Sequence, residues 1–91
     1  MRHMLAVVMD GIKDAEMMAG YAEMAMKHNA DRNVVAWFKT RAQNRMSMAE
    51  RDWHDVDDQL KVDKHDDELV EALECHVNRS LANLRERIER M

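Results

Sequence analysis

The chain has 91 residues, of which 46% are hydrophobic and 35% charged, and its formal net charge is −4 at pH 7. This length predicts one domain, 1–91, with a modest core. The single cysteine, Cys75, excludes an intramolecular disulfide and a cysteine-based zinc site. The apolar run Met4 to Met9 is too short for a membrane span. We therefore expect a cytoplasmic protein that does not associate with membranes.

The first predicted helix covers about residues 2–28. Its apolar positions recur at alternating spacings of three and four, at Leu5, Val8, Ile12, Ala15, Ala19, Ala22 and Met26. Toward the C-terminal half of this apolar stripe, or seam, the side chains become alanines, which allow another helix to approach closely. We therefore assign an interface to Ala15, Ala19, Ala22 and Met18. Met9, Met17, Met18 and Met24 are core filler or a second apolar face for a partner helix. Asn29 predicts the helix end, and Asp31 the cap of the next helix.

The second predicted helix covers about 32–62, and the third about 66–90. The second carries apolar residues at Val34, Val35, Trp37, Phe38, Ala42, Met46, Ala49, Trp53, Val56 and Leu60. We add Trp37 and Trp53 to the predicted interface. The third has its stripe at Val70, Leu73, Val77, Leu81, Leu84, Ile88 and Met91, after a run of acids suited to a helix N-terminus.

The connections between these segments are short, so neighbouring helices should run antiparallel. The predicted fold class is all-α: three long antiparallel amphipathic helices in a bundle completed by homodimerisation. Charge favours the dimer, because residues 52–74 carry a net charge of about −8 and the rest about +4. Within one chain the acidic halves of helices two and three meet, whereas an antiparallel partner brings basic halves to them. The alternative is a solvated acidic turn.

A candidate metal site lies on the second helix. Glu50, His54 and Asp57 follow one another at i, i+4 and i+7 and so share a helix face, and the hairpin brings Asp10 level with them. Iron, manganese or zinc would be the cofactor. The alternative is that these side chains make ordinary surface ion pairs and hydrogen bonds, in which case the protein has no cofactor.

Residues 14–21, with the sequence DAEMMAGY, resemble the first helix of ferritin-like di-iron proteins, where an inward glutamate precedes a tyrosine. The resemblance covers the first two helices. It implies a four-helix core and a di-metal carboxylate site with a redox or storage activity. The Glu-x-x-His motif of that family is absent, since Glu50 and His54 are four residues apart.

Two further functions have little support. A basic and aromatic stretch on the second helix is typical of nucleic-acid binding, but the net charge is negative and no binding motif is present. Cys75 and His76 are adjacent and so point about 100° apart on a helix, which does not suit a nucleophile and its base. We expect a non-enzymatic helical oligomerisation or interaction protein of unspecified role, with a metal-binding helical bundle as the alternative.

Overall fold

The computed structural model describes residues 2–62 and 67–91, with side chains described from residue 4 onward. Three helices occupy this part of the chain: α1 (Arg2–Lys27), α2 (Arg32–Val62) and α3 (Asp67–Glu89). The prediction of an all-helical chain is confirmed, and each helix begins and ends within one residue of its expected bounds. Residue 66, the predicted start of the third helix, lies outside the described residues.

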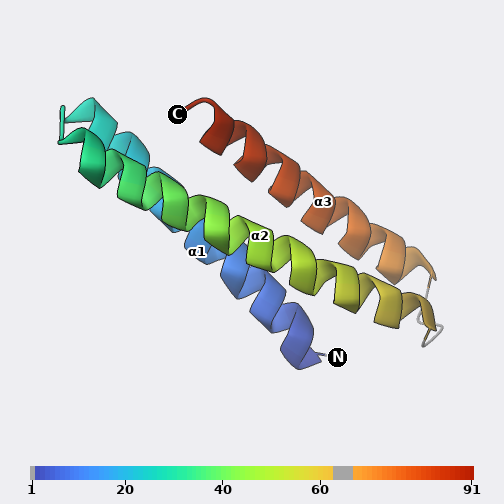
Figure 1. The fold of residues 1–91 in the computed structure, drawn as a ribbon. Helices are drawn as coiled ribbons and strands as arrows, with labels where there is room; N and C mark the ends of the chain where they lie inside the picture. The colour runs from blue at the N-terminus through green and yellow to red at the C-terminus, as the bar shows by residue number, and fades with distance from the viewer. Residues whose placement is uncertain (1, 63–66) are drawn as a thin grey trace.

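The chain runs along α1, returns along α2 and runs back along α3, so successive helices are antiparallel as predicted (Figure 1). The molecule is elongated, with principal extents of 50 × 18 × 15 Å. None of the described helices has the length and apolar character needed to cross a membrane.

One hydrophobic core is shared by the three helices. Its buried members are Val8, Ile12, Ala15 and Ala19 of α1, Ala42, Met46, Ala49, Trp53, Val56 and Leu60 of α2, and Val77, Leu81, Leu84 and Ile88 of α3. These residues follow the stripes expected from the sequence, because the helical repeat brings every third or fourth residue to one face. No polar or charged residue is buried among the described residues.

The turn between α1 and α2 has the capping geometry expected from its residues. Asn29 adopts a positive φ of 55°, the left-handed conformation that asparagine tolerates. Its backbone N–H donates to the carbonyl of Met26, and the N–H of Ala30 donates to that of Ala25, which is the Schellman arrangement. On the other side, Asp31 accepts a hydrogen bond from the Asn33 amide at 2.8 Å and caps α2. The turn itself therefore provides hydrogen-bond partners for backbone groups at the end of α1 and the start of α2, without any contribution from α3.

The structure shows which of the predicted interface residues the chain itself covers. Ala15, Ala19 and Ala22 are each 0% exposed, and Trp53 is 5% exposed, in the isolated chain. Met18 packs against the same core. These residues are covered by the chain's own helices, because α2 and α3 both reach the seam, so they offer no surface to a second chain in this arrangement. Of the predicted interface residues, Trp37 alone is largely exposed, at 55%.

Candidate functional site

The α2–α3 groove holds three of the four predicted metal ligands. It encloses about 370 Å³ and is lined by Glu50, Trp53, His54, Asp57, Asn78, Leu81, Ala82 and Arg85. The predicted i, i+4, i+7 pattern thus faces α3 along one side of α2. What the groove does chemically depends on how its polar groups are already engaged.

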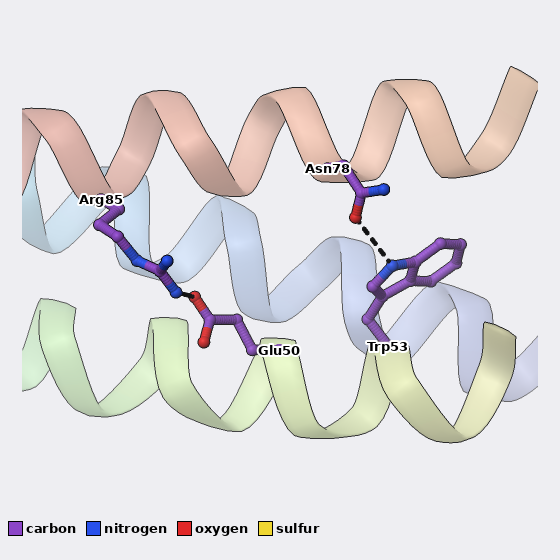
Figure 2. Close-up of polar contacts among 4 residues, drawn as sticks. All are labelled: Glu50, Trp53, Asn78 and Arg85. Carbon is purple, nitrogen blue, oxygen red and sulfur yellow. Dashed lines mark hydrogen bonds and ion pairs between the residues drawn. The ribbon is translucent and has the colours of Figure 1, made fainter. Parts of the chain in front are cut away.

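Glu50 forms an ion pair with Arg85, which reaches across from α3 (Figure 2). The two residues are 35 positions apart, so this contact links the second and third helices rather than neighbouring turns of one helix. A guanidinium beside the carboxylate competes with any cation for the same oxygen lone pairs. Glu50 is therefore satisfied by the fold itself.

Trp53 contributes the second polar link between these helices. Its indole Nε1–H donates a hydrogen bond of 3.2 Å to the side-chain oxygen of Asn78 (Figure 2). The indole ring is almost wholly buried, and a buried indole N–H normally needs an acceptor. Asn78 supplies that acceptor at the edge of the core, so this contact favours one rotational position of α3 against α2.

Asp57 lies between a cation and another carboxyl group. Lys61, one turn later on α2, places its Nζ 3.2 Å from Asp57 Oδ2, and the hydrogen bond and attraction to Asp57 raise the pKa of Lys61. From α3, the Glu74 carboxyl reaches the same aspartate. A hydrogen bond to Asp57, partial burial and repulsion from Asp57 raise the pKa of Glu74 above 4.5, and Lys61 opposes this rise.

Asp57 also has a polar atom without a hydrogen-bond partner in the described part of the chain. Asp57 Oδ1 is buried and accepts no hydrogen bond from the described residues. Two ionised carboxylates cannot donate to each other, so a hydrogen bond between Asp57 and Glu74 requires a proton on one of them. The acidic halves of the second and third helices therefore do meet within one chain, as the charge pattern predicted.

Asp10, the fourth predicted ligand, lies in a different groove. Gly11 packs directly against Ala49. Asp10 therefore lies at the same height along the helix axes as Glu50, as the sequence predicted. However, Asp10 lines the α1–α2 side of the hairpin, in a groove of about 270 Å³ that no α3 residue lines. The structure therefore separates it from the α2–α3 groove.

No group of three or more His, Cys, Asp or Glu side chains is arranged for a metal among the described residues. Metal binding and the ferritin-like comparison stay predictions, which elemental analysis of the purified protein would check.

The side of the α1–α2 hairpin turned away from α3 is the second candidate site, and we call it the open face. It consists of Met4, Val7, Asp10, Asp14, Met17, Tyr21 and Met24 of α1 with Val34, Trp37, Arg41, Arg45, Met48 and Asp52 of α2. At 100° per residue these positions of α2 point opposite to Glu50 and Asp57, which face α3. Its middle is the α1–α2 groove that contains Asp10 and Asp14.

An aromatic cluster occupies the end of the open face near the α1–α2 turn. The ring centroids of Tyr21 and Phe38 are 5.5 Å apart, and those of Trp37 and Phe38 are 5.1 Å apart with the rings nearly perpendicular. The Arg41 guanidinium lies 5.1 Å from the centre of the Trp37 ring, within the range of a cation–π contact. The cluster combines apolar area with positive charge on an exposed surface.

Sequence reasoning overlooked Tyr21 and Met48 as members of this surface. A usable signal was present, because both are large apolar or aromatic residues at positions that the core stripe of their helix does not use. The predicted second apolar face on α1 already contained Met17 and Met24. What the sequence lacked was the neighbour on α2 that makes these residues one surface.

Comparison with protein-family models, with curated proteins and with solved structures found no match for this chain.

Proposed function

We propose that the chain is a non-enzymatic helical interaction protein that forms a homodimer, and that the open face is its binding surface. The observation that carries this proposal is the gathering of large apolar side chains there. The chain has a single cysteine, which suits the reducing cytoplasm, and we propose the cytoplasm as its cellular location.

Exposed apolar residues are concentrated on this face rather than scattered. Among the described side chains, eight of the eleven exposed large apolar residues lie on it: Met4, Val7, Met17, Tyr21, Met24, Val34, Trp37 and Met48, with exposures from 37% to 58%. The other three are Met26, Val62 and Leu69. Single exposed apolar residues need no explanation, whereas a contiguous patch on a small protein marks an interaction site.

The residue types also suit binding. Tryptophan, tyrosine and methionine are enriched at protein interfaces, and methionine adapts its shape to a facing surface. A chain of this length buries only a modest share of its surface when it folds alone, so covering the open face would also stabilise the fold. Catalysis has no comparable support, since the polar groups of the α2–α3 groove are largely engaged with one another.

The oligomeric state of two matched variants tests this proposal. Sedimentation velocity over a range of protein concentrations should give a dimer for the parent chain and a monomer for Trp37→Ser, because this substitution removes the largest side chain of the open face. Leu69→Ser removes an apolar side chain that is 54% exposed and lies on α3, away from the open face, so it should leave the dimer intact. A parent chain that stays monomeric at every concentration would refute the proposal.

A further inference from the structure

We infer that α3 exchanges between two copies of this chain. In the exchanged dimer, α2 and α3 join into one long helix, and α3 of each copy packs on the α1–α2 hairpin of the other. The inference concerns the face of the hairpin that α3 covers, so it goes beyond the proposed function and does not depend on the open face. It follows from the positions of the apolar stripes of α2 and α3 along the sequence.

The buried residues of α2 and α3 belong to one repeat of seven. In α2 the buried positions advance in alternate steps of four and three residues from Ala42 to Leu60, and in α3 they do so from Val77 to Ile88. Val77 follows Leu60 by seventeen positions, which is two repeats of seven and one step of three. The alternation therefore continues from α2 into α3 without a shift. A single helix made of both would carry its apolar stripe along one side.

The junction between α1 and α2 lacks this property. Three repeats of seven after the buried Ala22 of α1 lead to Gln43, one position beyond the buried Ala42 of α2. One position is about 100° around a helix, so α1 and α2 joined end to end would not share a stripe. An antiparallel pair within one chain does not need a common repeat. The common repeat of α2 and α3 is thus a separate feature, which a continuous helix would use.

The sequence between α2 and α3 is also compatible with a helix. Residues 63–66 are Asp-Lys-His-Asp and include neither glycine nor proline, the residues that most strongly oppose a continuous helix. By contrast, the α1–α2 turn contains Asn29 in the left-handed conformation and the capping residue Asp31. Joining α2 to α3 would place the backbone groups at their facing ends in intrahelical hydrogen bonds.

The contacts between α2 and α3 fix the position of the two-fold axis. Glu50 pairs with Arg85 and Trp53 with Asn78 (Figure 2), and both pairs are centred between residues 65 and 68 of the sequence. When two long helices cross such an axis at this point, Glu50 lies beside the partner's Arg85, and Trp53 beside the partner's Asn78. Each α2–α3 contact of the single chain is then made twice between the copies, so the exchanged dimer needs no new complementary surface.

Charge and packing set the conditions for exchange. Residues 52–74 hold ten acids and two lysines, a net charge of about −8, and the exchanged dimer brings two such segments together at the axis. Their repulsion favours the closed single chain at low salt and is screened at high salt. Exchange from the folded state is slow, because α3 must first expose its buried stripe. We therefore expect exchange when the unfolded chain refolds at high protein concentration and high salt.

A cross-link between α2 and α3 distinguishes the two forms. Glu50→Cys with Arg85→Cys, in a chain that also carries Cys75→Ser, places two thiols at a contact that is within one chain when closed and between copies when exchanged. Adding Trp37→Ser removes association through the open face. After refolding from urea at high concentration and salt, the sample is diluted, treated with a short bis-maleimide and analysed by denaturing electrophoresis. We expect a species of twice the chain mass, whereas material refolded at low concentration should run at the mass of one chain.

Two insertions after Lys64 test the common repeat in the same assay. One added alanine rotates α3 by about 100° against α2 in a continuous helix, so it should lower the yield of exchanged dimer by about tenfold or more. Seven added alanines keep the repeat and should give the parent yield or more. The closed chain tolerates a longer connection, and urea denaturation at low protein concentration checks that both insertion variants fold.

The outcomes separate this inference from the proposed function. A cross-link that stays within one chain under the refolding conditions refutes the exchange, while the open-face dimer is judged by sedimentation of the chain with Trp37 intact. Equal yields of exchanged dimer from the two insertion variants would refute the continuous α2–α3 helix. An open face that binds nothing leaves the prediction of exchange unchanged, because the cross-linked chain carries Trp37→Ser.

Discussion

The two glycines of α1 offer a sharp test of how closely the helices pack. In a helix interior, replacing glycine by alanine stabilises by about 1 kcal/mol through helix propensity alone. The two sites differ in what the added methyl group meets. At Gly20 the nearest atom outside the local backbone is Nη2 of Arg87, 3.4 Å away at the end of a flexible side chain. At Gly11 it is the Cβ of Ala49, only 3.3 Å away on a buried part of α2.

We therefore expect Gly20→Ala to keep most of the propensity gain and to raise the melting temperature by about 4–8 °C, as one kcal/mol does in a chain of this size. Gly11→Ala gains the same propensity, but carbon atoms prefer a separation of about 3.5–4.0 Å, so α1 or α2 must move. Overpacking of this kind costs about 1–3 kcal/mol, which cancels or exceeds the gain.

Urea denaturation of both variants at one protein concentration measures the difference in free energy of unfolding. Gly20→Ala should be more stable than Gly11→Ala by at least about 1 kcal/mol. Equal stabilisation by the two substitutions would show that Ala49 does not crowd Gly11, and would refute the close approach on which the register between α1 and α2 rests.

Three further predictions concern α3 and its contacts. Leu84→Ala should lower the free energy of unfolding by about 2–5 kcal/mol in urea denaturation, because this side chain is only 2% exposed. Asn78→Ala should cost about 1–3 kcal/mol in the same assay, because it leaves the buried Trp53 indole N–H without its acceptor. Glu74→Gln should raise the melting temperature at pH 7, because the ionised carboxyl group faces Asp57. That gain should shrink as the pH falls.

The sign of the pH effect follows from the raised pKa of Glu74. The folded chain binds this proton more tightly than the unfolded chain, whose carboxyl titrates near 4.5. The contribution of the proton to stability is fully present below pH 4.5 and is lost as the pH rises through the higher folded pKa. Melting curves from pH 4 to pH 8 for the parent and for Glu74→Gln would test this, and a constant difference in melting temperature would contradict it.

For Leu84→Ala and Asn78→Ala, losses in the free energy of unfolding below about 0.5 kcal/mol, typical of exposed positions, would contradict the packing described for α3.

The sequence by itself determined the helices, their ends and their core stripes. The repeat of 3.6 residues places Val8, Ile12 and Ala15 on one face whatever surrounds the helix, and Asn29 and Asp31 end and begin helices through local backbone geometry. The level of Asp10 beside Glu50 was also predictable, since a tight turn fixes the register of a hairpin. These features depend on neighbours within a few residues along the chain.

Tertiary structure alone decided how each helix is rotated against the others. That rotation sends Asp10 and Glu50 to different grooves although they are level, pairs Glu50 with Arg85, and brings Glu74 to Asp57. It also decides that the alanine seam is covered within the chain while Trp37 stays exposed. The physical reason is that periodicity gives angles around one helix axis, whereas the angle between two helices depends on how side chains from distant parts of the sequence fill the space between them.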